Sequence, residues 1–146
     1  MEKVGSVLEK KGSTVWTISP DAIVYRALEM MSNKGVGALV VVNEKGKVEG
    51  IISERDYARK VILQGKSSKE TYVKEIMTTE LFVVNRSTSL EECMGIMTEK
   101  RIRHLPVIED DKLIGIISIG DVLKAIIEAQ GIMIEHLSNY IMGGYV

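Results

Sequence analysis

The chain has 146 residues, of which 45% are hydrophobic and 27% are charged, and its formal net charge is −1. This composition is typical of one compact domain, or of two small halves that share a core. The near-neutral charge argues against nucleic acid or an anionic membrane as a partner, and the apolar runs are too short to span a bilayer.

Hydrophobic periodicity and turn residues predict alternating helices and strands along the chain. In the first half we expect a helix over 1–11, a strand over 15–18, a helix from Asp21 to Asn33, strands over 38–42 and 48–53, and a helix from Glu54 to about Gly65. In the second half we expect a helical turn over 73–77, a strand over 81–84, a helix with a Ser89–Glu92 capping box, a strand over 113–118 and a helix over 119–129. After Gly131 we expect a last helical segment, whose apolar residues must cover this chain or a partner: Ile132, Ile134, Leu137 and Ile141.

The two halves of the chain repeat one another. The stretch Gly50-Ile-Ile-Ser-Glu-Arg-Asp56 returns 65 residues later as Gly115-Ile-Ile-Ser-Ile-Gly-Asp121. Upstream, residues 22–33 and 37–42 return 66 residues later as 88–99 and 103–108. The difference of one residue falls in the turn between two strands. Each unit therefore predicts the order strand, helix, strand, tight turn, strand, helix.

Each repeat ends in a Ser–x–x–Asp motif at a strand-to-helix junction. Ser53 and Ser118 stand at the expected helix N-cap, and Asp56 and Asp121 fall in the first helical turn, where the helix dipole favours a carboxylate. This spacing has a purely structural interpretation. It also permits ligand binding, because an ionised carboxylate accepts two hydroxyl hydrogens side by side. The presence of the motif in both copies favours binding.

The ordered set of motifs resembles a pair of CBS motifs, named after cystathionine β-synthase, in a small stand-alone protein. The stretches that resemble the first motif are Thr17–Asp21, Gly37–Val42 and Gly50–Asp56, and those that resemble the second are Arg101–Val107 and Gly115–Asp121. The resemblance implies an α+β fold in which two βαββα units pack with pseudo-two-fold symmetry around a cleft. We expect the first motif with its lead-in helix over 1–66, the second with its preceding linker over 67–129, and a helical tail over 130–146.

In the resembled family this serine and aspartate hold the ribose of an adenosine nucleotide. That implies Ser53 with Asp56 in one site, and Ser118 with Asp121 in the other. The adenine is expected in an apolar slot between the first strand and the strand after the first helix. The matching residues are Thr17, Ile18, Ala38, Val83, Val84 and Leu105.

Phosphate groups require donors and positive charge, and basic residues gather near both motif ends. These are Arg55, Arg59, Lys60, Arg101, Arg103 and His104. The alternative interpretation is that they are solvated surface residues. The two copies also differ, since unit two has Arg103-His104 where unit one has Gly37-Ala38, and we expect the two sites to differ in affinity or ligand.

The predicted function is a regulatory sensor that binds AMP, ADP, ATP or NAD(H) as its ligand, with no obligatory cofactor, and acts through a homodimer or through a regulated enzyme or transporter. The alternative is a structural dimerisation or adaptor module with a vestigial pocket. We expect that the protein is not an enzyme and has no metal site. The sequence shows no Ser–His–Asp arrangement of a catalytic triad, no glycine-rich phosphate loop and no Cys/His set of metal ligands.

The sequence predicts a cytoplasmic protein without nucleic-acid binding or membrane insertion, and the N-terminal residues do not resemble a signal peptide. The single cysteine, Cys93, permits no intrachain disulfide, which fits a reducing compartment. We expect Cys93 to be a buried apolar residue, with a redox sensor as the minor alternative.

Overall fold

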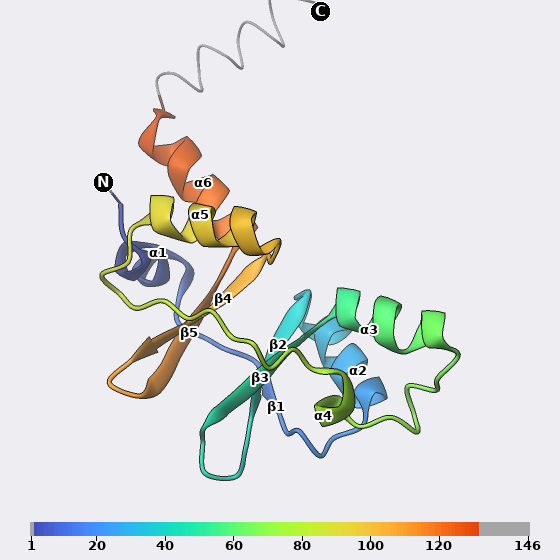
Figure 1. The fold of residues 1–146 in the computed structure, drawn as a ribbon. Helices are drawn as coiled ribbons and strands as arrows, with labels where there is room; N and C mark the ends of the chain where they lie inside the picture. The colour runs from blue at the N-terminus through green and yellow to red at the C-terminus, as the bar shows by residue number, and fades with distance from the viewer. Residues whose placement is uncertain (1, 132–146) are drawn as a thin grey trace, which may run out of the picture.

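The structure is a computed structural model that describes residues 2–131. It contains two units side by side, each a small sheet covered by helices (Figure 1). The first unit contains β1 (Thr17–Ile18), α2 (Val24–Lys34), β2 (Ala38–Val42), β3 (Val48–Ser53), α3 (Glu54–Lys60), the 3₁₀ turn η1 (Ile62–Gln64) and α4 (Val73–Ile76). The second unit contains α5 (Leu90–Lys100), β4 (His104–Glu109), β5 (Lys112–Ser118) and α6 (Ile119–Ala129), and α1 (Val4–Lys11) packs on it.

Both sheets are built around a hairpin. In the first unit β1 pairs with β2 in parallel and β2 pairs with β3 in antiparallel order, whereas β4 and β5 form the second hairpin. The first hairpin turns at Gly46, with φ 80°, and the second at Asp110 and Asp111, with φ 49° and 62°. Glycine and aspartate tolerate this left-handed backbone. The shorter second turn confirms the position of the one-residue difference between the repeats.

The predicted strand over 81–84 is not formed, and only Val84 pairs with the sheet, opposite Val107. In the first unit the Val40 N–H donates to the Trp16 carbonyl at 3.4 Å. Pro106 holds the place of Val40 in the repeat and has no N–H to donate. The segment before Val84 therefore lacks this bond and stays irregular.

Most other predicted elements are confirmed, including the strands over 38–42 and 48–53 and the helix over 119–129. The predicted capping box at Ser89 forms in part: the Ser89 hydroxyl accepts from the Glu92 N–H at 3.1 Å and lies 3.4 Å from Glu92 Oε1. The predicted helical segment after Gly131, with Ile132, Ile134, Leu137 and Ile141, lies outside the described residues.

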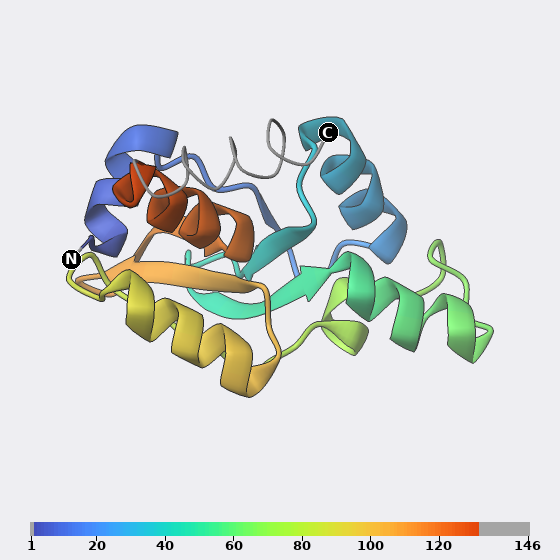
Figure 2. The same cartoon turned by 90° about the horizontal axis from the view of Figure 1, so that it is seen from above.

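Each unit has its own apolar core, and α1 contributes to the second. Val4, Val7 and Leu8 are buried together with residues of α5, β4, β5 and α6. The Val4 N–H donates to the Thr88 carbonyl at 2.9 Å, which ties α1 to the segment before α5. Figure 2 shows α1 beside α6. The first helix of the chain thus packs on the second unit, and its last residue, Lys11, reaches the end of β5.

Candidate functional site

Both Ser–x–x–Asp motifs form the predicted N-caps, and each is a complete capping box. At α3 the Asp56 N–H donates to Ser53 Oγ at 3.2 Å, and the Ser53 N–H donates to Asp56 Oδ2 at 2.9 Å. At α6 the same two bonds join Ser118 and Asp121 at 3.1 and 2.8 Å. The capping box fixes each carboxylate at the strand-to-helix junction, so the structural role and a binding role are compatible.

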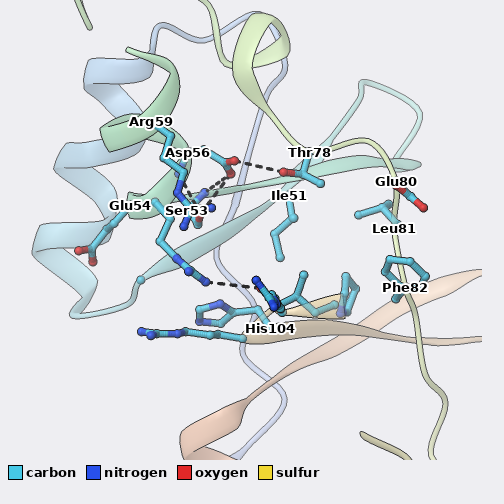
Figure 3. A pocket seen from close by; sticks show the side chains of 16 residues that line it. Ile51, Ser53, Glu54, Asp56, Arg59, Thr78, Glu80, Leu81, Phe82 and His104 are labelled. Atoms are coloured by element: carbon cyan, nitrogen blue, oxygen red, sulfur yellow. Dashed lines mark hydrogen bonds between the residues drawn. The ribbon is translucent and has the colours of Figure 1, made fainter. Parts of the chain in front are cut away.

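A cavity of about 320 Å³ lies between the two units, next to the first motif (Figure 3). Ser53 and Asp56 line it from the β3–α3 junction, and His104 faces them from the start of β4. Apolar side chains from both units also line the cavity: Ile51, Leu81, Phe82, Ile102 and Pro106. Its remaining lining residues are Gly37, Glu54, Thr78, Glu80 and four arginines. The cavity therefore combines a carboxylate of one unit with the segment before β4 of the other.

Five of the six residues predicted to bind phosphate line this cavity, namely Arg55, Arg59, Arg101, Arg103 and His104. The sixth, Lys60, is not among the lining residues. Its Nζ lies 3.1 Å from Asp56 Oδ1 and donates to the Ile76 carbonyl at 2.9 Å. Lys60 thus neutralises Asp56 from outside the cavity and ties α3 to α4.

The six residues predicted to line an adenine slot do not line this cavity, and their part in binding stays a prediction. Ile18, Ala38, Val84 and Leu105 are buried, and of these Ile18, Val84 and Leu105 belong to the two cores. Thr17 and Val83 are exposed, and none of the six lines the cavity. The side chains of a strand alternate between its two faces. Ile18 of β1 and Leu105 of β4 lie on the faces that pack on the cores, and this explains why they do not reach the cavity.

The sequence interpretation missed the apolar residues of the cavity because it paired each motif with strands of its own unit. One signal was available. Phe82 and Trp16 share a place in the repeat, and each has a lysine over its ring, Lys100 at 5.2 Å from the Phe82 centroid and Lys34 at 4.2 Å from that of Trp16. Of these two aromatic residues only Phe82 lines the cavity.

The four arginines of the cavity lack acidic partners within the described part of the chain. None of Arg55, Arg59, Arg101 and Arg103 has a carboxylate within 4.0 Å there. Among the same residues, their guanidinium groups make one hydrogen bond, from Arg55 Nη1 to the Arg101 carbonyl at 3.5 Å. Burial lowers the pKa of His104, and the positive charges of Lys11 and Arg103 also lower it. The negative charge of Asp121 acts in the opposite direction and raises this pKa. Four guanidinium groups in one cavity are suited to an anion.

The second motif has a different environment. Ser118 and Asp121 do not line the 320 Å³ cavity. Asp121 instead lines a smaller cavity of about 120 Å³ between α1 and α6, and Lys11 Nζ lies 2.7 Å from its Oδ2. Burial by itself would raise the pKa of Asp121, but hydrogen bonds from Lys11 and Ser118 hold that pKa below its usual value. Asp121 is therefore an ion-paired carboxylate.

Two further features of the described residues bear on the kind of site. Residues 2–131 contain no cluster of three His, Cys, Asp or Glu side chains suited to hold a metal ion. Within the same residues no helix has the length and apolar character needed to cross a bilayer.

The thiol of Cys93 is buried, which raises its pKa to about 11, and the negative charge of Glu92 also raises this pKa.

Comparison with known proteins finds one family. The model of the CBS domain matches residues 7–62 and 73–128. The CBS domain-containing protein CBSX3, mitochondrial, of Arabidopsis thaliana is 47% identical over 138 residues, which cover 92% of this chain and 66% of that protein. The chain thus spans slightly less than two thirds of that relative. Its name assigns the relative to mitochondria, and the cytoplasmic location of this chain stays a prediction.

Solved structures agree. A protein with CBS domains from Burkholderia ambifaria MC40-6 is 49% identical, with a TM-score of 0.83 over 88% of this chain and 96% of that chain. The CBS domain pair of protein MJ0100, in complex with 5′-methylthioadenosine and S-adenosyl-L-methionine, has a TM-score of 0.77 at 23% identity and covers 86% of this chain and 96% of that chain. The α+β fold of two paired motifs is confirmed.

Proposed function

Because the chain belongs to the CBS domain family, we propose that it is a regulatory sensor of adenosine nucleotides that binds its ligand in the cavity between the two units. The observation that carries this proposal is the pairing of two kinds of group in one cavity. Asp56, fixed by its capping box, is an acceptor for hydroxyl groups, and four arginines that pair with no carboxylate of residues 2–131 line the same space. A ribose phosphate carries hydroxyl groups that complement the carboxylate and a negative charge that complements the arginines.

The ribose hydroxyls would bind Asp56 from the cavity side. Asp56 Oδ1 accepts from the Thr78 hydroxyl at 3.2 Å, and Thr78 also lines the cavity. A hydroxyl both donates and accepts, so Thr78 is able to turn toward a ribose while the sugar takes its place on Asp56. Ser53 holds the carboxylate in place through the cap.

The base would lie against the apolar wall formed by Ile51, Leu81, Phe82, Ile102 and Pro106. Aromatic and aliphatic surfaces both suit the face of a purine. The MJ0100 pair, whose ligands are adenosine compounds without phosphate, supports adenosine as the common part of the ligand. In this chain the arginines add a preference for phosphate. The cavity volume of about 320 Å³ is at the lower end of the range for ligand sites, which favours a mononucleotide such as AMP over a dinucleotide such as NAD(H).

Calorimetric titration of AMP, ADP, ATP and NADH into the wild type and Asp56→Asn tests the proposal. Loss of a hydrogen bond to a charged group should weaken AMP binding by about 1.5–3 kcal/mol. Glu54→Gln removes a neighbouring carboxylate of the same cavity and should weaken binding much less. A nucleotide that binds should also raise the melting temperature by mass action.

The competing function is a dimerisation or adaptor module whose cavity binds nothing. Failure of all four nucleotides to bind or to raise the melting temperature would favour it. The regulated partner would be an enzyme, a transporter or a second copy of this chain, and nucleotide binding would act on the contact between the two units, because the cavity has walls on both.

A further inference from the structure

The two Ser–x–x–Asp motifs are contacted by different elements of the chain. At the first motif, the Thr78 N–H donates to the Ile51 carbonyl at 2.9 Å and the Thr78 hydroxyl donates to Asp56 Oδ1 at 3.2 Å. Lys60, one helical turn after Asp56, supplies the balancing charge at 3.1 Å. A neutral side chain therefore occupies the cavity side of this carboxylate, and the lysine stays outside.

At the second motif the lysine comes from α1. Lys11 Nζ donates to Asp121 Oδ2 at 2.7 Å and to the Ile116 carbonyl at 2.9 Å. In the repeat, Ile116 corresponds to Ile51, so Lys11 takes the carbonyl equivalent to the one that Thr78 takes. On the carboxylate, Lys11 takes Oδ2 of Asp121, the oxygen that also caps α6, whereas Thr78 takes Oδ1 of Asp56. Ala125 corresponds to Lys60, and Met77 corresponds to Lys11. Each aspartate thus pairs with one lysine. The lysine that pairs with Asp56 lies one turn later on the same helix, α3, whereas the lysine that pairs with Asp121 lies on α1, at the start of the chain.

This exchange changes what the second carboxylate is able to bind. An ammonium group only donates, so it cannot accept a ribose hydroxyl as the Thr78 hydroxyl can. Its bond to a carboxylate is charge-assisted and therefore among the stronger hydrogen bonds of a protein. Lys11 is also held in place, because it ends a helix whose Leu8 is buried against Gly115; a Cβ at Gly115 would lie 2.7 Å from Leu8 Cδ2.

We infer that Lys11 closes the second motif to a ribose, so that each chain binds one nucleotide, at Asp56. The low pKa of Asp121, which its bonds to Lys11 and Ser118 maintain against burial, agrees with a carboxylate kept in an ion pair. The inference rests on the proposed function for the role of the aspartate. It goes beyond that function by assigning the stoichiometry to one side chain outside both motifs.

The test is the number of AMP molecules bound per chain, measured by calorimetry. Wild type should bind one; Asp56→Asn should remove most of this binding and Asp121→Asn should leave it within twofold. Lys11→Met installs the residue found at the matching repeat position, and we expect it to bind two. Lys11→Ala is a second, smaller variant. Lys10→Met removes the same charge one residue earlier, from an ammonium group that pairs with Glu2 and not with Asp121, and this variant should still bind one.

The outcomes separate the inference from the proposed function. Two AMP per wild-type chain, one of them lost in Asp121→Asn, would overturn the closure by Lys11 and leave the nucleotide sensor intact. One AMP per chain in both folded Lys11 variants would do the same. Two sites in Lys11→Met that return to one when Asp121→Asn is added would support the inference. No binding by the wild type or any variant would refute the proposed function and the inference together.

Discussion

Arg103 immediately precedes β4 and His104 begins it, where the first unit has Gly37 and Ala38. The repeat therefore places a guanidinium group and an imidazole at a position that in the other copy carries almost no side chain. Both line the cavity next to Asp56. Since the fold of the first unit forms without these side chains, their presence in the second is better explained by binding than by packing.

Arg103→Ala should weaken the binding of AMP by about 1.5–3 kcal/mol and leave adenosine nearly unchanged, because the lost contact is to phosphate. Arg103→Lys should restore only part of the affinity, since an ammonium group lacks the bidentate fork of arginine. Calorimetry with AMP and adenosine measures both effects. Arg26→Ala, a surface arginine paired with Glu29 on α2, is the control. Equal weakening of both ligands by Arg103→Ala would make Arg103 a structural residue.

Cys93 provides a second prediction on a single side chain. Its thiol is buried in the second core and has a pKa of about 11, so hardly any reactive thiolate forms at neutral pH. The native chain should therefore not react with a thiol reagent such as DTNB, and unfolding in urea should release one reactive thiol per chain. Rapid reaction of the native chain at neutral pH would instead revive the redox-sensor interpretation.

Two segments each precede one sheet in the sequence but approach the hairpin of the other repeat, at two corresponding glycines: α1, and Met77 with Thr78 directly after α4. A Cβ at Gly50 would lie 2.8 Å from the Thr78 carbonyl oxygen and 2.9 Å from Met77 Sδ. At Gly115 the corresponding contact is with Leu8. Gly50 and Gly115 each begin a repeated stretch, and each lies where another segment of the chain passes too close for a Cβ atom. This close approach explains why both positions are glycine.

Gly50→Ala should destabilise the fold by about 1–3 kcal/mol, the usual effect of overpacking, because backbone at Thr78 must move. Gly95→Ala is the matched control. Gly95 is exposed inside α5 with nothing within 4 Å of its Cβ position, and alanine there should stabilise the helix by about 0.5–1 kcal/mol. Urea unfolding followed by circular dichroism measures both. An unchanged or raised stability in Gly50→Ala would show that the contact with α4 is loose.

The molecule as a whole presents apolar side chains at corresponding positions after its two motifs. Ile62 in η1 and Ile127 in α6 are related by the repeat and are 54% and 46% exposed. The apolar pattern of the last part of the sequence also predicts four subunit contacts, namely Ile126, Ile127, Ile132 and Leu137. Of these, Ile126 packs partly on the second core, Ile127 is exposed, and the other two lie outside the described residues. Exposed apolar surface at two related positions favours an interface.

We predict a homodimer that loses stability when charge enters this surface. Ile62→Glu with Ile127→Glu should shift the chain from dimer to monomer in light scattering at micromolar concentration, because a carboxylate is costly to bury without a partner. Val83→Glu, at an exposed apolar residue of the segment between the units, should leave the dimer intact. A monomeric wild type, with and without nucleotide, would contradict the prediction.

The sequence by itself determined the repeat, the strand-to-helix junctions and the two capping aspartates, because these depend on local propensities and on spacing along one segment. It also pointed to all five basic groups of the cavity wall, together with Lys60, which the structure leaves outside that wall. Tertiary structure decided which segments meet. It brought Thr78 and Phe82, from the segment between α4 and α5, to the cavity beside Asp56, left Lys60 outside that cavity and carried Lys11 of α1 to Asp121. Such contacts join residues more than 20 positions apart across a pseudo-symmetric core, and no local pattern specifies which of two equivalent partners a segment takes.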